Sequence, residues 1–306
     1  MYDNIPKISI LVITYNQEKV IGRAIDSVLC QKEYVHEIII GEDCSTDNTR
    51  NIVKEYAEKF PKLIKPIYNE QNLGIFGNME NLYDKPTGDV VFLLAGDDEF
   101  CNGLFISAIR LIEDKKINYR NESFCFYFDF KEINNNGHET VFSNEMINNN
   151  FNPVSLKLRG LINNRSCGFS SKILNKFSPV PKDIGIYADL ILDIQLQKYS
   201  THNYYFPFIG SIYYTDIGIA KNTSKQEHYK SLIKACDEIE RIIPLNKRDK
   251  NYNKFRKEFS DFNITPSLRQ FFKVAYYYFN SIQYRYGIRG LKINKTFSIM
   301  RRLFLF

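Results

Sequence analysis

The 306-residue chain has no tryptophan, only four histidines, and six cysteines without a paired spacing. Four histidines that form no cluster make a zinc site unexpected, and the cysteines predict free thiols rather than disulfides or a metal knuckle. No stretch of about 18 apolar residues occurs, so no membrane-spanning helix is predicted. No signal peptide precedes the cysteines, and we therefore expect a cytoplasmic protein.

Two glycine-rich phosphate-binding motifs are also missing. A dinucleotide-binding fold needs a glycine-rich turn after its first strand, so that a pyrophosphate can approach the backbone. Here residues 8–13 read as the first strand, and the next turn is Thr14-Tyr15-Asn16-Gln17, with no glycine before Gly22. No loop ending in Gly-Lys-Ser/Thr is present either. A bound pyrophosphate would therefore have to be neutralised by a metal ion.

The N-terminal third alternates between strand and helix periodicities. Its expected strands are residues 8–13, 37–40, 63–68 and 89–94, and its expected helices are residues 18–30, 47–60 and 76–83. Ser45 or Thr46 would be the N-cap of the second helix. This order predicts an α/β fold whose mainly parallel sheet has helices on both faces.

Polar clusters follow three of these strands, at Thr14–Asn16, Glu42–Ser45 and Asp97–Glu99. In parallel sheets ligands bind beyond the carboxyl ends of the strands, so the three clusters predict one site. Asp97 and Asp98 end an apolar strand, where mutual repulsion makes their ionisation costly unless a cation is bound. Hard divalent cations often bridge one or two carboxylates to substrate phosphates. The alternative for the acids is an ordinary solvated turn.

These motifs, in this order, resemble family 2 glycosyltransferases with the GT-A fold. The matching pieces are Ile10–Asn16, Gly41–Thr49, Asn72–Gly74, and Gly88-Asp89 leading into Asp97-Asp98. The resemblance is close over residues 7–100, looser over residues 100–220, and absent beyond about residue 225. It implies a sheet of the Rossmann-like GT-A type and an inverting, nucleotide-sugar-dependent transfer.

The resemblance also implies roles for single residues. Asp98 would contact Mn²⁺ or Mg²⁺ on the diphosphate, and Asp43 would accept the N3–H of uracil or thymine. The other nucleotide-binding residues would be Thr14, Tyr15, Asn16, Asn72, Gly74 and Asp97, of which Asp97 would hold hydroxyls or a metal-bound water. A turn acid is the alternative for Asp43. Ala95 departs from the fuller Asp-x-Asp-Asp motif, which could weaken the metal dependence.

The acceptor hydroxyl must lose a proton as it attacks, so a carboxylate is needed on the face opposite the leaving group. The resemblance implies that this base lies at a helix start in the second half of the chain. The family's helix-start context is similar to Tyr187–Leu192, which makes Asp189 the candidate. Asp183 and Asp193 are rivals, with Asp193 expected as a solvated partner one turn along the helix. Arg165 would meet an anionic or polar acceptor group, or else be a surface arginine.

The last 45 residues carry eight Lys or Arg and no Asp or Glu, so the net charge of +6 comes from this tail. Aromatic and aliphatic residues accompany the charges, a pattern typical of interfacial membrane segments. A helical hairpin packed on the core and a nucleic-acid patch are the alternatives, and nucleic acid is not the predicted partner. We expect residues 1–100 to bind the nucleotide sugar, residues 101–225 the acceptor, and residues 226–306 to form a helical, membrane-associating extension.

The sequence therefore predicts an enzyme that moves a sugar from a UDP- or dTDP-sugar to a saccharide acceptor, which we expect to be lipid-linked. The setting would be O-antigen or capsule synthesis at the inner face of the plasma membrane. A nucleotidyltransferase that makes nucleotide sugars is one alternative, although the turn at Thr14–Gln17 lacks the glycine-rich signature of such enzymes. A non-catalytic nucleotide-sugar-binding module is the other.

Overall fold

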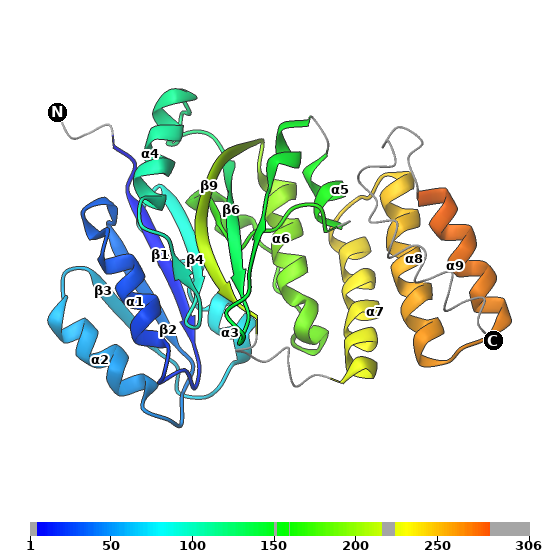
Figure 1. Ribbon diagram of the computed structural model, residues 1–306, viewed down its shortest axis with the longest axis horizontal. Coiled ribbons are helices and arrows are strands. Elements are labelled where there is room, and N and C mark those ends of the chain that lie inside the picture. Colours follow the sequence, from blue (N-terminus) through cyan, green and yellow to red (C-terminus); the bar gives the residue numbers. More distant parts are fainter. Residues whose placement is uncertain (1–4, 150–151, 159, 216–223, 282–306) are drawn as a thin grey trace. The chain divides into compact units, whose positions relative to one another are not determined.

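The computed structural model describes residues 5–149, 152–158, 160–215 and 224–281 (Figure 1). The chain divides into two compact units. The first consists of residues 1–183 and 188–222, and the second of residues 184–187 and 223–306. Each unit is described by itself below.

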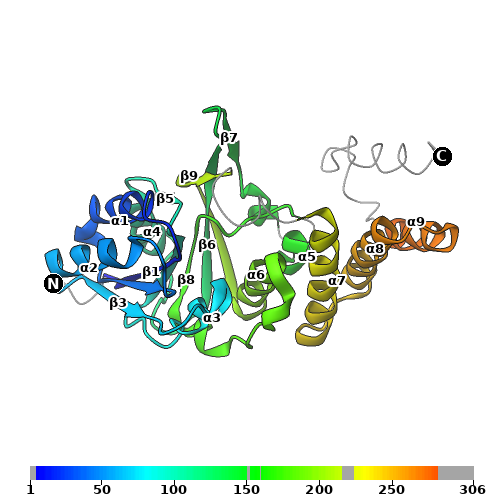
Figure 2. The same cartoon turned by 90° about the horizontal axis from the view of Figure 1, so that it is seen from below.

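The described residues of the first unit form a nine-stranded sheet (Figures 1 and 2). Its strands lie in the order β3-β2-β1-β4-β8-β6-β9-β5, and β7 pairs with β6. Strands β1 to β4 are parallel, whereas β8 runs antiparallel to both β4 and β6. The bounds are β1 Ile8–Thr14, β2 Glu37–Glu42, β3 Ile64–Tyr68, β4 Val90–Ala95, β5 Glu99–Phe100, β6 Phe124–Ile133, β7 Glu139–Phe142, β8 Cys167–Ser170 and β9 His202–Tyr214.

Helices cover both faces of this sheet, because alternate strand residues are apolar on each face. On one face the core joins β1, β2 and β4 to α1 (Ile21–Leu29), α2 (Thr49–Lys59) and α4 (Leu104–Asp114). The other face carries α3 (Gly74–Glu80), α5 (Pro153–Leu158) and α6 (Ala188–Tyr199). The predicted α/β architecture is confirmed.

The predicted start of the second helix is wrong. Helix α2 begins at Thr49, and its N-cap is Asn48 rather than Ser45 or Thr46. The reason is that residues 45–46 are held by the neighbouring loop: Ser45 Oγ accepts a hydrogen bond from Asn16 N, and Thr46 N donates to Asn16 Oδ1. The loop that follows β2, residues 43–48, therefore ends two residues later than expected, and it is tied to the loop that follows β1.

Glu37 is a buried carboxylate between β1, β2 and β3. Lys65 Nζ lies 2.6 Å from its Oε2, while Ser9 Oγ and Thr87 N donate to its Oε1. Burial raises the pKa of Glu37, but these hydrogen bonds outweigh burial and bring the pKa down to about 2. Because the folded-state pKa lies below the ordinary 4.5, the carboxylate stabilises the fold above pH 4.5, and this contribution is lost as the pH falls towards 2.

We expect Glu37→Gln to lower the free energy of unfolding by about 2–3 kcal/mol at pH 7, since it removes a buried, hydrogen-bonded charge from its partners. The difference from the wild type should shrink below pH 4.5. Urea unfolding at several pH values measures it. The matched control is Glu58→Gln, whose exposed pair with Lys54 should contribute less than about 0.5 kcal/mol. Equal losses in the two variants would contradict the role of Glu37.

The second unit contains the helices α7 (Lys225–Ile242), α8 (Lys247–Ile264) and α9 (Leu268–Ser281). Ser224 and Glu227 form a capping box at the start of α7, and Asn246 caps α8. Buried residues from all three helices form its core, namely Ala235, Cys236, Ile239, Phe255 and Val274. Residues 282–306, which carry most of the predicted basic tail, lie outside the described residues.

Among the helices of the described residues, none has the length and apolar character needed to cross a bilayer.

Candidate active site

One cavity of about 820 Å³ lies at the carboxyl ends of the parallel strands β1, β2 and β4. Seven residues predicted to bind the nucleotide line it together: Thr14, Tyr15, Asn16, Asp43, Asn72, Gly74 and Asp97. These residues come from four separate segments of the sequence. The structure thus brings them to one place, as expected from the position of each segment after its strand.

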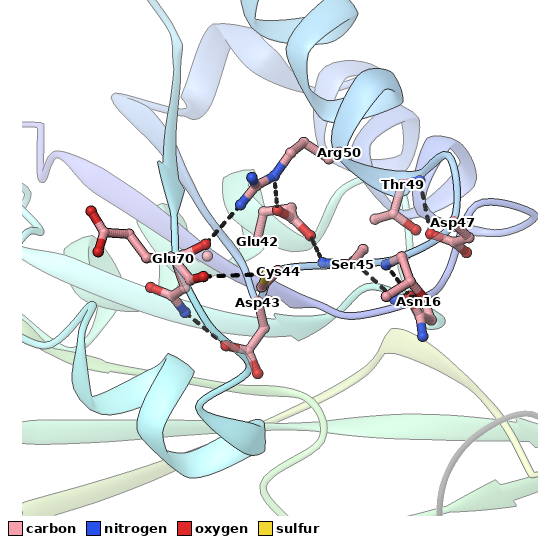
Figure 3. A network of polar contacts seen from close by, with 12 residues as sticks. Asn16, Glu42, Asp43, Cys44, Ser45, Asp47, Thr49, Arg50 and Glu70 are labelled. Carbon is pink, nitrogen blue, oxygen red and sulfur yellow. Dashed lines mark hydrogen bonds and ion pairs between the residues drawn. The ribbon is translucent and has the colours of Figure 1, made fainter.

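A network of polar contacts holds the loops that follow β1 and β2 (Figure 3). Glu42, fully buried, accepts from Arg50 Nε at 2.5 Å and from Ser45 N at 2.7 Å. Asn16 and Cys44 both adopt positive φ angles, 51° and 57°, which only a well-supported loop maintains in residues other than glycine. The network therefore fixes the backbone on either side of Asp43.

Asp43 lies at the inner wall of the cavity and is 2% exposed. Its Oδ1 accepts hydrogen bonds from Asn69 Nδ2 and Leu73 N, and its Oδ2 accepts one from Gly74 N, all at 2.8 Å. A carboxylate has about four lone-pair sites, so one site on Oδ2 is left for a ligand. The same contacts hold the loop that contains Asn72 and Gly74 against the cavity.

Two large apolar side chains are exposed within this cavity. Tyr15 is 37% exposed and Ile75 is 43% exposed, and both line it. A flat heterocycle gains by covering such surfaces, because their burial is favourable. Tyr15 was predicted from the sequence, whereas Ile75 was missed. The signal that could have found Ile75 is an apolar residue directly after the turn glycine Gly74.

Asp97 and Asp98 are half-buried at the end of β4, and Asp97 lines the cavity. Burial raises the pKa of Asp97, and burial together with the neighbouring Asp97 raises the pKa of Asp98 to about 7. Asp98 Oδ1 accepts a hydrogen bond from Tyr214 N at 3.3 Å. Two crowded carboxylates that are costly to ionise fit a divalent cation, which would offset their repulsion.

Within the described ranges, no group of three or more His, Cys, Asp or Glu side chains forms a metal centre. The Asp97–Asp98 pair fits a Mg²⁺- or Mn²⁺-type site in which phosphates and water supply the remaining ligands. Asp98 is the residue predicted to hold the ion, and of the two acids Asp97 is the one that lines the cavity.

A cluster that the sequence did not reveal ties the acids to β9. Arg23 Nε lies 2.8 Å from Glu99 Oε1, and its guanidinium lies 3.8 Å from the centre of the Tyr214 ring. Tyr214 Oη donates to Glu99 Oε1 at 2.5 Å, and Arg23 Nη2 donates to the carbonyl of Asp97 at 2.8 Å. Glu99, the third acid of the sequence cluster, is therefore paired with protein groups.

Asp189 lies in the first turn of α6. Its side chain reaches solvent, but protein packed closely around the carboxyl group partly removes that group from water. Burial and the neighbouring Asp193 raise its pKa, and Lys157 lowers it. Asp193 was expected to be solvated, and this is wrong: it forms an ion pair with Lys157, whose side chain is largely buried. The reason is that α5 packs beside α6, which the sequence did not reveal. Asp183 lies before α6, in the turn Lys182–Tyr187.

Arg165 precedes β8, whose residue Gly168 pairs with Phe92 of β4. Because β8 runs antiparallel to β4, the residues before it lie at the carboxyl end of β4, where Asp97 and Asp98 follow. The guanidinium of Arg165 lies 3.2 Å from the centre of the Tyr213 ring. Its charge also lowers the pKa of Asp97, Asp98 and Asp189, against the larger effect of burial.

Comparison with known proteins gives a family match. The family model described as Glycosyl transferase family 2 matches residues 9–171, just over half of the chain. Curated relatives align with this chain over about 100 residues at 31–40% identity. The aligned part is 28–37% of the relatives' own lengths. One of them, the GalNAc(5)-diNAcBac-PP-undecaprenol beta-1,3-glucosyltransferase of Campylobacter jejuni, is 34% identical over 32% of this chain and 32% of its own.

Two solved structures cover most of the chain. S. aureus TarS in complex with UDP-GlcNAc has a TM-score of 0.65 and 18% identity, and covers 89% of this chain and 79% of TarS. The mannosyltransferase PcManGT of Pyrobaculum calidifontis, solved with GDP-Man and Mn²⁺, has a TM-score of 0.56 and 14% identity, and covers 98% of this chain and 85% of PcManGT. At these identities the likeness shows a common fold.

Proposed function

The chain belongs to glycosyl transferase family 2 with the GT-A fold, and on this premise we propose that it is an inverting transferase using a UDP- or dTDP-sugar. The observation that carries the proposal is that seven predicted nucleotide-binding residues line one cavity. The aligned part is only about a third of the curated relatives' lengths, so donor, acceptor and partners are all part of the proposal.

The proposed choice of uracil or thymine as the base of the donor is supported by the free lone pair of Asp43. Because its other sites accept from Asn69, Leu73 and Gly74, Asp43 has room for one further N–H. Uracil and thymine present one N–H at N3, whereas cytosine presents an acceptor there. Tyr15 and Ile75 offer apolar surface to the ring. The fold likeness to TarS, which was solved with UDP-GlcNAc, agrees with this choice.

Asp98 is proposed to hold Mn²⁺ or Mg²⁺, with Asp97 positioned for sugar or ribose hydroxyls. When bound, the ion offsets charge on the diphosphate as it leaves. The half-buried, mutually repelling carboxylates support this assignment. PcManGT, which shares the fold, was solved with Mn²⁺.

Asp189 is proposed as the general base of a single displacement. Its carboxylate takes the proton of the acceptor hydroxyl while the oxygen attacks the anomeric carbon. The bond from that carbon to the diphosphate oxygen breaks with its electron pair on the phosphate, and the configuration inverts. Since burial and Asp193 raise its pKa, Asp189 is a stronger base than an ordinary carboxylate.

The acceptor is proposed to be a lipid-linked saccharide of a cell-surface polysaccharide, such as an O-antigen or capsule, at the cytoplasmic face of the membrane. A Campylobacter jejuni relative is named for an undecaprenol-linked acceptor. Residues 226–306 would associate with the anionic surface, since the last 45 residues carry eight basic and no acidic residues. Phe272 and Tyr276, on one side of α9, are 63% and 62% exposed.

The donor assignment predicts the effect of Asp43→Asn. The amide keeps one acceptor oxygen for Asn69 and Leu73 but places N–H groups where Oδ2 now accepts. UDP binding should weaken by about 1.5–3 kcal/mol, and CDP, whose N3 is an acceptor, should gain relative to UDP. Titration calorimetry with UDP and CDP in Mn²⁺ measures both. The exposed Asp84→Asn variant is the control. If the ratio of UDP affinity to CDP affinity is unchanged in Asp43→Asn, Asp43 is an acid of the turn without contact to the base.

The membrane assignment predicts salt-sensitive binding to anionic vesicles. Ending the chain after Ser281 removes six of the eight basic residues of the tail and keeps α9. Each basic residue near an anionic surface contributes about 1 kcal/mol, so vesicle binding should fall more than about 100-fold. Turnover on a soluble acceptor should persist. The comparison is vesicle sedimentation at low and high salt, with neutral vesicles as the control. If the full chain does not bind anionic vesicles at low salt, the proposed membrane association is wrong.

A further inference from the structure

Arg165 is held in place by its backbone. Its N–H donates to Asn163 Oδ1 at 3.0 Å, and its carbonyl accepts from Ser211 Oγ of β9 at 3.1 Å. The next residue, Ser166, is fully buried, and its carbonyl accepts from Phe128 N at 2.9 Å. The segment before β8 is therefore fixed between β6 and β9, at the carboxyl end of β4.

The guanidinium of Arg165 is positioned but not neutralised. One face stacks on the Tyr213 ring at 3.2 Å, which leaves the N–H groups along the edges free to donate. In the described part of the chain, no carboxylate lies within ion-pair distance of it, and it donates no side-chain hydrogen bond. Arg23 and Lys157 differ, because they pair with Glu99 and Asp193. Lys19 also lines the nucleotide cavity, but its side chain is exposed.

Arg165 lies at the end of the site that holds Asp97 and Asp98. It precedes β8 at the carboxyl end of β4, and the residue after its stacking partner Tyr213 donates its backbone N–H to Asp98 Oδ1 at 3.3 Å. The adjacent Asn164 has both side-chain amide atoms buried and without a hydrogen-bond partner among the described residues. A rigid cation and an unsatisfied amide next to a diphosphate site are the groups that an anionic oxygen-rich ligand would use.

We propose that Arg165 is a further catalytic residue, which binds the β-phosphate of the donor and stabilises its charge as the diphosphate leaves. This rests on the proposed function, which places a diphosphate beside Asp97 and Asp98. As the bond between the anomeric carbon and the β-phosphate oxygen breaks, the electron pair stays on that oxygen, and the planar guanidinium can donate two N–H groups to the phosphate. Arg165 would thus share with the metal ion the charge of the leaving group.

The test compares UDP with UMP, which lacks the β-phosphate. Their Kd values are measured by calorimetry, in Mn²⁺ and in chelator, for the wild type, Arg165→Ala, Arg165→Lys and Arg165→Gln. Arg165→Ala should weaken UDP binding about 10- to 100-fold and leave UMP binding within about twofold. The Kd of Arg165→Lys for UDP should lie between those of the wild type and Arg165→Ala, since lysine keeps the charge without the bidentate geometry. The exposed Arg110→Ala variant, on α4, should match the wild type.

The outcomes separate the two proposals. If the wild type does not bind UDP with any metal ion, the proposed function itself is overturned. A wild type that binds UDP, with an unchanged UDP-to-UMP ratio in Arg165→Ala, overturns only the role of Arg165. A raised KM for the acceptor alongside that unchanged ratio would make Arg165 an acceptor-binding residue instead. If Arg165→Ala does not fold, the ratio in Arg165→Gln decides, and a wild-type ratio there overturns the proposal.

Discussion

Asp189→Asn is expected to lower kcat by about 10²–10⁴-fold while the Kd for UDP stays within about twofold of the wild type. General-base catalysis typically contributes a rate factor of this size, and the amide cannot accept the proton of the acceptor hydroxyl. Asp189 is not among the residues that line the nucleotide cavity, so donor binding should be untouched. Steady-state kinetics with a nucleotide sugar and acceptor, and calorimetry with UDP, measure the two quantities.

Two matched variants test the choice of Asp189. Asp183→Asn changes an exposed acid in the turn before α6 and should retain activity. Asp193→Asn breaks the ion pair with Lys157. It should lower the free energy of unfolding, with only a small effect on kcat. An inactive Asp193→Asn with an active Asp189→Asn would move the base one helix turn. Retention of configuration in the product, observed by NMR, would contradict a single displacement altogether.

The raised pKa of Asp189 also gives a pH dependence with a defined sign. Burial and Asp193 favour the protonated carboxyl, so the rate should already fall at a pH where an ordinary aspartate is still ionised. Removing the charge of Asp193 should shift the acidic limb of kcat/KM to lower pH. A shift to higher pH would contradict the assignment of this acidic limb to Asp189.

The residues that line the cavity after β1, β2 and β4 could be predicted from the sequence because they follow these strands directly. Residues 14–16, 43 and 97–98 come after apolar runs, and parallel strands must bring such segments to one edge. The position of these clusters was predicted from local periodicity and a general rule of sheet topology, whereas Asn72, Gly74 and the role of each residue came from the family resemblance. The same reasoning gave the helices on both faces of the sheet.

The remaining parts depend on contacts between segments far apart in the chain. Arg23 meets Glu99 and Tyr214 only because β9 pairs with β5. Lys157 meets Asp193 only because α5 packs beside α6. Strands β6, β8 and β9 combine parallel and antiparallel pairing, with a register shift near Asp129, and their order follows from no local pattern.

Asp98→Asn is expected to abolish the increase in UDP affinity caused by Mn²⁺ or Mg²⁺ and to lower transfer about 10³-fold. A Lewis-acid contact to a leaving phosphate contributes several kcal/mol to the transition state. The amide keeps an oxygen that can accept from Tyr214 N, so the end of β9 should remain in place. It also removes a buried charge that Asp97 repels, so the metal-free variant should unfold at the same or a higher temperature than the wild type.

Thermal unfolding with and without UDP and Mn²⁺ separates these effects, because a ligand that binds only the folded state raises the unfolding temperature. Mn²⁺ and UDP together should raise the unfolding temperature of the wild type. For Asp98→Asn, UDP with Mn²⁺ should raise the unfolding temperature no more than UDP in chelator does. The exposed Asp114→Asn variant of α4 should behave as the wild type. A metal-dependent gain that survives in Asp98→Asn would place the ion on Asp97 instead. Equal UDP binding by the wild type in chelator and in Mn²⁺ would exclude the metal site at these two carboxylates.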